Sequence, residues 1–226
     1  MSNARTVEFF FDFGSPATYL AWTQLPGLCA AVGATLVQRP MLVGAVFKAT
    51  GNASPITIPA KGRWVIEDLA RYARRYGVPI AVNPHFPVNT LVPMRIATGV
   101  QRERPAEFDA LQTALFRAMW VDRRNLGDPA TLGEVIAGAG LDAAALIALA
   151  DRQDVKDALK ATTEEAIRRG AFGAPTMFVG DTMFFGQDRL DFVREALERS
   201  CAASLSPAGP SASAAGTRRA TARSCA

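Results

Sequence analysis

The first forty residues alternate between apolar runs typical of strands and a spacing typical of a helix. Residues 6–13, TVEFFFDF, are almost continuously apolar and rich in aromatic and β-branched side chains. This pattern predicts a strand covered on both faces. Residues 34–42, ATLVQRPML, predict a second strand. With a helix between them, the two strands predict a strand–helix–strand unit with a parallel crossover.

The intervening helix has clear start and stop signals. Ser15 is a good N-cap residue, and Pro16 fits the first helical position because an N–H there would have no helical partner. Gly33 is a typical stop signal. Pro26 lies inside the predicted helix and is expected to kink it or split it in two.

A long helical pattern occupies the middle of the chain. Within residues 46–160 the apolar positions recur mostly every three or four residues, as in RWVIEDLARYARRYG and EFDALQTALFRAMW. The Gly-Asp-Pro sequence at residues 127–129 interrupts the pattern, which then resumes. This stretch predicts an all-helical insertion in an α/β core.

Strand patterns return near the C-terminus. Residues 155–169 predict a helix, GAPTMFVG at 173–180 predicts a strand entered through a proline, and TMFFG at 182–186 predicts its hairpin partner. A last helix is expected over residues 188–199.

The order of these elements predicts the domain organisation. Residues 1–45 and 161–202 are expected to form one α/β domain, with residues 46–160 as the inserted helical domain. Residues 203–226 are rich in small residues and proline, so they are expected to form a disordered tail.

Charge and hydropathy exclude some classes of function. The formal net charge is +4, but three arginines lie in the last ten residues, and without them it is 4 − 3 = +1. A nucleic-acid partner is therefore not expected. No apolar run reaches the length of about 18 residues that a membrane span needs, and the N-terminus lacks a signal-peptide pattern. A cytoplasmic enzyme is the default expectation.

Cysteine and histidine are too sparse to suggest metal or disulfide chemistry. Cys29, Cys201 and Cys225 are widely spaced, and His85 is the single histidine, so neither a disulfide framework nor a metal site is expected. Cys29 lies on the apolar face of a predicted helix and is expected to be a buried thiol. His85 has no partner in its motif NPHFP, and we interpret it as structural.

Three sequence elements occur together in an order typical of one enzyme family: FDFGSPATYLA, FPVNTLVPMR and GAPTMFVGDTMFFGQDRL. With them, the chain resembles the 2-hydroxychromene-2-carboxylate isomerases over about residues 6–200. This family belongs to the DsbA-like part of the thioredoxin superfamily, close to the kappa-class glutathione transferases. The resemblance implies a thioredoxin-like core with a large all-helical insertion, glutathione as cofactor and a homodimer. Gly14 departs from the usual family form and is expected to loosen the turn before the serine.

The serine at the first helix start is the implied catalytic residue. Thioredoxin-like oxidoreductases carry two cysteines at this helix start, where the helix dipole stabilises a thiolate. Here the four positions read Ser15-Pro16-Ala17-Thr18, which excludes disulfide exchange by this motif. The resemblance implies that the Ser15 hydroxyl donates to the glutathione sulfur, and lowering the thiol pKa by about one unit corresponds to about 1.4 kcal/mol. The alternative is that Ser15 only caps its helix.

The resemblance also implies which backbone segment binds the peptide part of glutathione. In the family the bond between Ala174 and Pro175 is cis, and it exposes the backbone of Ala174 as a strand edge. Pairing of that edge with a bound peptide is β-augmentation. A trans turn is the alternative, because few X–Pro bonds are cis in general.

A third segment, Gly186-Gln187-Asp188-Arg189, opens the last predicted helix and is implied to bind the γ-glutamyl end of glutathione. Amides at a helix start suit its carboxylate, and Asp188 suits its ammonium group. The alternative role of Asp188 is that of an N-cap, which is compatible with ligand binding.

The insertion is implied to bind the second substrate, an acidic aromatic compound. Lys48, Asn52 and Asn89 match family positions that contact this substrate, and a lysine and two amides suit a carboxylate and a phenolic or keto oxygen. The alternatives are a solvated surface lysine and turn asparagines. Lys61 and Arg63 are further candidates for the same task.

The implied reaction is the glutathione-dependent isomerisation of a 2-hydroxychromene-2-carboxylate to a trans-o-hydroxybenzylidenepyruvate, as in the breakdown of naphthalene-like compounds. The thiolate adds to the ring-opened enone, the former double bond rotates, and elimination returns the thiol. Two alternatives stay open. A kappa-like glutathione transferase would leave glutathione attached to the product, and a non-catalytic thioredoxin-like binding module would not bind glutathione.

Overall fold

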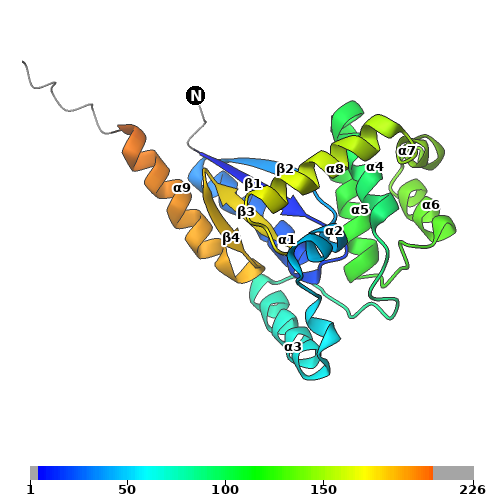
Figure 1. Cartoon of the computed structure of the whole chain (residues 1–226), viewed down its shortest axis with the longest axis horizontal. Coiled ribbons are helices and arrows are strands. Elements are labelled where there is room, and N and C mark those ends of the chain that lie inside the picture. The colour runs from blue at the N-terminus through cyan, green and yellow to red at the C-terminus, as the bar shows by residue number, and fades with distance from the viewer. Residues whose placement is uncertain (1–4, 206–226) are drawn as a thin grey trace, which may run out of the picture.

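A four-stranded mixed sheet is the centre of the computed structural model, which describes residues 5–205, with side chains to residue 199 (Figure 1). The strand order is β2-β1-β3-β4. β1 (Thr6–Phe11) pairs in parallel with β2 (Thr35–Pro40) and antiparallel with β3 (Thr176–Val179), which forms a hairpin with β4 (Thr182–Phe185). The predicted strand–helix–strand unit and the late hairpin are confirmed.

Helices cover both faces of this sheet. Successive side chains of β1 point to opposite sides, so β1 packs against helices on both faces. Phe9 and Phe11 are fully buried in the large apolar cluster that includes α1 (Pro16–Val32) and α9 (Leu190–Leu205). Phe10 belongs to a second cluster, which includes residues of α8 (Gln153–Arg168). The continuous apolar run of β1 is explained by this burial on two sides.

The signals that predicted α1 act as expected at both of its ends. Ser15 accepts a hydrogen bond from the Thr18 N–H at 3.1 Å, Pro16 is the first helical residue, and Gly33 ends the helix with a left-handed φ of 63°. Pro26 lies inside one continuous helix, so the predicted split is wrong. Burial of α1 residues on both sides of the proline holds the helix together despite the lost backbone hydrogen bond.

The described residues between β2 and α8 contain helices and loops but no strand, as predicted for the insertion. Its α-helices are α2 (Val43–Thr50), α3 (Pro59–Tyr76), α4 (Leu91–Glu103), α5 (Phe108–Trp120), α6 (Pro129–Gly138) and α7 (Ala143–Leu149). The predicted end of the insertion at residue 160 lies within α8, and the division into domains stays a prediction.

Aromatic residues of α5 join the insertion to the start of α1. The ring centroid of Phe116 lies 4.8 Å from that of Phe13 and 4.9 Å from that of Trp22. Trp120 Nε1 donates to the Phe13 carbonyl at 2.8 Å. The insertion and the α/β core therefore share one hydrophobic cluster, which fixes the insertion relative to the loop that carries Ser15.

Three further expectations concern burial and the chain end. Cys29 is buried as predicted, and burial raises the pKa of its thiol to about 11. Of the predicted tail, residues 203–205 belong to α9, and residues 206–226 lie outside the described residues. Among the helices within residues 5–205, none has the length and apolar character needed to cross a bilayer.

Candidate functional site

Ser15 lies between the sheet and the start of α1, where its hydroxyl makes two hydrogen bonds. Its Oγ accepts from the Thr18 N–H at 3.1 Å and donates to the Ala174 carbonyl at 2.9 Å. The second bond joins segments 159 residues apart in the sequence. Because the helix cap uses the oxygen only as an acceptor, the hydroxyl proton can turn from Ala174 to another acceptor. Capping and ligand binding by Ser15 are therefore compatible.

Two other side chains with potential chemistry are Thr18 and His85. Thr18, at the position of the second oxidoreductase cysteine, is fully buried, and its hydroxyl has no hydrogen-bond partner within residues 5–205. His85 is exposed in a loop. In the described part of the chain, no group of three or more His, Cys, Asp or Glu residues could hold a metal ion.

The segment opposite Ser15 has an unpaired backbone donor. The bond between Ala174 and Pro175 is cis, as predicted. The Ala174 N–H has no hydrogen-bond partner in the part of the chain that the structure describes, whereas the Pro175 carbonyl accepts from the Gly186 N–H at 3.1 Å. The structure thus brings four predicted residues together in one chain of contacts, from Ser15 through Ala174 and Pro175 to Gly186.

The segment after β4 is a 3-10 turn rather than the start of the last helix. Gln187–Arg189 form the turn, and α9 begins at Leu190, two residues later than predicted. Gly186 has a φ of 99°, and a Cβ atom there would lie 2.5 Å from Oδ1 of Asp188. Only glycine allows this close approach. Asp188 pairs with the neighbouring Arg189 at 2.7 Å and makes no N-cap bond.

Tyr76 fixes the same turn from α3. Its hydroxyl donates to the Gln187 carbonyl at 2.7 Å, and burial raises the pKa of Tyr76 to about 12, so the donor stays protonated. Beside this bond lies a cavity of about 380 Å³ between α1, α3 and the start of α9. Asp188 lines the cavity, but Ser15 does not. Of the residues predicted to bind glutathione, Asp188 alone lines this cavity.

The three predicted substrate residues lie on separate segments, at the end of α2, just beyond it and just before α4. Asn52 donates from Nδ2 to the Phe172 carbonyl at 2.7 Å, and its Oδ1 accepts from the next backbone N–H at 2.8 Å. Asn89 Oδ1 accepts from a backbone N–H at the start of α4 at 3.0 Å. Lys48 is exposed at the end of α2, with no partner within residues 5–205. Asn52 is thus tied to the segment of Ala174, and both amides are used in loop structure.

Asp12, which the sequence analysis did not single out, organises the turn before Ser15. Its fully buried carboxylate accepts from the Gly14 N–H at 2.8 Å, the Val43 N–H at 2.8 Å and the Thr90 hydroxyl at 2.7 Å. Its carbonyl also accepts from the Ser15 N–H at 3.1 Å. The Gly14 N–H is itself one of the donors that hold this turn. The sequence signal was an acid within the apolar run FFFDF.

The partners of Asp12 come from three parts of the chain. Val43 is the first residue of α2, and Thr90 precedes α4, next to Asn89. Burial raises the pKa of Asp12 above its ordinary value of 3.8, and the three hydrogen bonds partly oppose this effect. One buried carboxyl therefore fixes the Ser15 turn and the entrances of two insertion helices.

Comparisons with known proteins agree with this architecture. The family model of the DSBA-like thioredoxin domain matches residues 6–198. A 2-hydroxychromene-2-carboxylate isomerase of Sphingobium xenophagum is 31% identical over 198 residues, which cover 85% of this chain and 98% of the relative. Glutathione S-transferase kappa 1 of Homo sapiens is 30% identical over 220 residues, which cover 90% of this chain and 96% of the relative.

A solved structure gives the same result in three dimensions. A 2-hydroxychromene-2-carboxylate isomerase superposes with a TM-score of 0.77 at 30% identity, over 89% of this chain and 100% of the other. A probable DsbA oxidoreductase of Streptomyces coelicolor has a TM-score of 0.70 at 21% identity and therefore shares the fold.

Replacing Asp12 by asparagine should change how stability depends on pH. Because the pKa of Asp12 is raised in the folded state, the folded protein binds more protons than the unfolded chain above pH 3.8. The free energy of unfolding of the wild type, relative to Asp12→Asn, should therefore fall as pH rises from about 4 towards the folded pKa. Urea unfolding of both proteins between about pH 4 and pH 8 measures this difference.

Asp128 offers a control of opposite sign. The N-cap hydrogen bond from the Thr131 N–H lowers the pKa of Asp128. The stability of the wild type relative to Asp128→Asn should therefore be lost as pH falls through the folded pKa of Asp128. A difference between wild type and Asp12→Asn that stayed constant or rose with pH would contradict the burial effect at Asp12.

Proposed function

Because the chain belongs to the DSBA-like thioredoxin family, with 2-hydroxychromene-2-carboxylate isomerases and kappa-class glutathione transferases among its relatives, we propose that it is a glutathione-dependent isomerase of 2-hydroxychromene-2-carboxylates. The observation that carries the proposal is the Ser15 hydroxyl at the start of α1, beside the unpaired Ala174 N–H. This arrangement supplies donors for a guest sulfur and for the peptide that carries it. It supplies no thiol for disulfide exchange.

Glutathione would bind across the segments that meet at Ser15. Its peptide backbone would pair with the free Ala174 N–H, next to Pro175, as an added strand edge. Its γ-glutamyl end would bind at the turn of Gly186 to Arg189, where Asp188 supplies a carboxylate for the ammonium group. Gly186 keeps that carboxylate close to the backbone, and the Tyr76 hydroxyl holds the turn in place.

The chemistry follows from a stabilised thiolate. In the proposed step the Ser15 hydroxyl and the amide dipoles of α1 favour the ionised sulfur, which adds to the conjugated carbon of the ring-opened enone. The former double bond becomes single and rotates, and elimination restores the alkene as the trans isomer. The carbon–sulfur bond that forms in the first step breaks in the last, so glutathione is regenerated. No other co-reactant is required.

The insertion would supply the contacts to the acidic aromatic substrate. Lys48 has no partner within residues 5–205, so its ammonium group is available for a carboxylate. Asn52 would act through the Phe172 carbonyl that it holds, and Asn89 lies beside Thr90, which is bound to Asp12. These residues would place the substrate near the Ser15 hydroxyl. Naphthalene-like aromatics are the proposed source of such substrates.

Two aspects of cellular context follow from the proposal. The reaction needs reduced glutathione, so we place the enzyme in the cytoplasm, where thiols are kept reduced.

We also propose a homodimer, because α3 exposes large apolar side chains. Trp64 is 58% exposed and Ile66 is 41% exposed, while Ile58, just before the helix, is 57% exposed. Exposed apolar side chains grouped on one element are typical of subunit contacts.

Replacing Ser15 by alanine should abolish most of the isomerase activity. Loss of the hydroxyl removes a donor to the developing anion, and we expect kcat/KM to fall about 100-fold. The assay follows the ultraviolet spectrum of a hydroxychromene carboxylate with and without glutathione. Asp142→Ala is the control, because it removes a helix N-cap in α7 of similar structural value, about 1 kcal/mol, far from the site in sequence.

The same assay separates the alternatives. An isomerase leaves the glutathione concentration unchanged, whereas a glutathione transferase consumes it in proportion to product. If the wild type with glutathione produced no change in the spectrum of the hydroxychromene carboxylate, the proposed isomerase activity would be overturned. Equal activities of Ser15→Ala and the wild type would overturn the role of the hydroxyl.

The dimer proposal is tested by molar mass. Light scattering during size-exclusion chromatography should give twice the chain mass of 24.1 kDa for the wild type. Trp64→Glu should give the monomer, because a buried unpaired charge is unfavourable in an apolar contact. Val82→Glu is the control at another exposed apolar position, which is 59% exposed, and it should stay dimeric. A monomeric wild type contradicts the proposal.

A further inference from the structure

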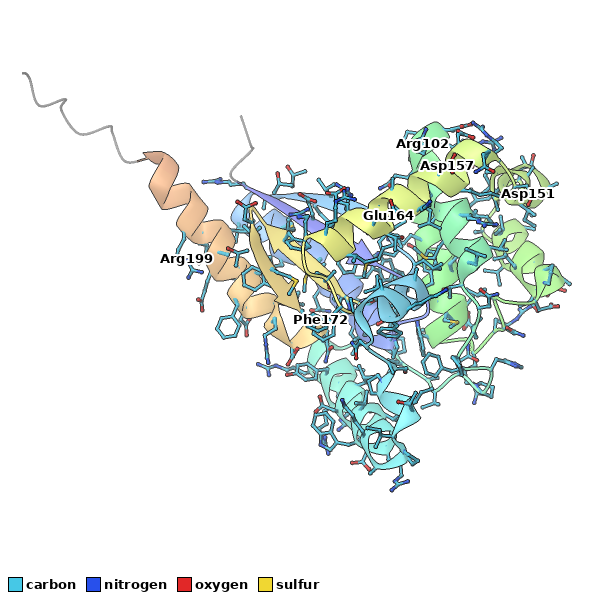
Figure 2. The ribbon with its side chains drawn as sticks, viewed as in Figure 1. Arg102, Asp151, Asp157, Glu164, Phe172 and Arg199 are labelled. Atoms are coloured by element: carbon cyan, nitrogen blue, oxygen red, sulfur yellow. The ribbon has the colours of Figure 1, made fainter. Side chains whose placement is uncertain are left out.

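Two phenylalanine rings lie in contact beside the candidate site. Phe172 and Phe185 have ring centroids 4.5 Å apart with an interplanar angle of 46°. Phe172 is two residues before Ala174, and Phe185 ends β4, directly before Gly186. The two residues, called the ring pair below, therefore stand on the two segments that we propose to bind glutathione. Figure 2 shows Phe172 near α2, in agreement with its hydrogen bond to Asn52.

The ring pair is exposed although phenylalanine in this chain is mostly buried. Each ring residue is 38% exposed, whereas Phe9, Phe10 and Phe11 in β1 are fully buried. Scattered apolar side chains on a surface need no explanation, but two rings in contact form a continuous apolar patch. Flat aromatic faces of this kind bind other aromatic rings in offset or edge-to-face geometry.

The surrounding backbone fixes the ring pair before any ligand binds. A Cβ atom on Gly173 would lie 2.9 Å from Cε2 of Phe185, so the ring occupies space that only glycine leaves open. The Asn52 side chain holds the Phe172 carbonyl at 2.7 Å. Thr176, opposite Phe185 in the hairpin, donates from its hydroxyl to the Gly173 carbonyl at 2.8 Å. Preorganisation of this kind reduces the entropy lost on binding.

Helix α2 borders the ring pair at Phe47, and the next residue in the sequence is a lysine. Phe47 in α2 has its Cε1 atom 3.7 Å from the position of the same Gly173 Cβ. The next residue, Lys48, has no partner within residues 5–205. An aromatic surface that is combined with an ammonium group is complementary to an aromatic carboxylate. Glutathione has the carboxylates but lacks the ring.

We propose that the ring pair, Phe172 and Phe185, is the binding surface for the aromatic ring of the acceptor, with the acceptor carboxylate directed to Lys48. This inference rests on the proposed function and adds to it the residues that select an aromatic acceptor. From this surface, the conjugated side chain of the acceptor faces the Ala174 segment, where Ser15 donates its hydrogen bond. The ring pair is a specificity determinant and takes no part in proton transfer.

Steady-state kinetics with Phe172→Ala and Phe185→Ala test the assignment. Each variant should raise KM for the hydroxychromene carboxylate about ten-fold, because apolar area and an aromatic contact are lost. KM for glutathione should stay within about two-fold of the wild-type value, since the ring pair does not bind the thiol. Phe185→Leu, which retains apolar volume without the ring, should fall between the wild type and Phe185→Ala.

The matched control is Phe192→Ala. Phe192 is another exposed phenylalanine, 50% exposed in α9, with no ring contact to the pair. It should leave both KM values unchanged. An unchanged acceptor KM in both ring-pair variants overturns the inference, as does a rise in glutathione KM of the same size. A change of molar mass in these variants would assign the rings to a subunit contact and would also overturn it.

A binding measurement separates this inference from the proposed function. 2-Naphthoate, an aromatic carboxylate with intrinsic fluorescence, is titrated against the wild type, both ring-pair variants, Lys48→Gln and Phe192→Ala. Kd for 2-naphthoate should rise about ten-fold in the ring-pair variants and should stay at the wild-type value in Phe192→Ala. Lys48→Gln should weaken the binding of 2-naphthoate but not the binding of 2-naphthol, which lacks the carboxylate. This pattern in a protein without isomerase activity would support the ring pair and reject the reaction, whereas equal Kd values would reject the ring pair itself.

Discussion

The buried carboxylate of Asp12 is the constraint on which the site depends. A charged group with no exposure is tolerated only when hydrogen bonds replace its water, and Asp12 accepts three. Each such bond to a charged group contributes about 1.5–3 kcal/mol, and removing a partner leaves a buried group unpaired. The donors come from Gly14, Val43 and Thr90, so satisfying the charge places the Ser15 turn against the entrances of α2 and α4.

This constraint explains how an α/β core and a helical insertion make one site. The turn after β1 presents Ser15 to the segment before β3, where the hydroxyl donates to Ala174. α2 is fixed at its start through Val43, and Asn52, just beyond its end, is bound to Phe172. In this chain of the DSBA-like thioredoxin family, the helix start carries a serine rather than a cysteine. In the proposed function the sulfur is supplied by a ligand, and the hydroxyl would act as its donor.

Local signals in the sequence predicted the elements well, because strand burial and helix capping depend on neighbouring residues. The capping of α1 by Ser15 and its end at Gly33 needed no knowledge of the rest of the chain. The family resemblance added the cis bond at Pro175. The role of Asp12 was missed because its partners at Val43 and Thr90 are 31 and 78 residues away. Pro26 does not split α1, because tertiary packing outweighs its local preference. The ring pair was missed because it depends on contacts between distant segments.

In the proposed function, the Ser15 hydroxyl at the start of α1 keeps a bound glutathione sulfur ionised. The most direct measurement is the pKa of the bound thiol, obtained from the ultraviolet absorbance of the thiolate as a function of pH in the saturated complex. We expect a pKa below that of free glutathione, and an increase of about one unit or more towards the free value in Ser15→Ala. A bound thiol that titrates like free glutathione, or equally in both proteins, would contradict this role of the hydroxyl.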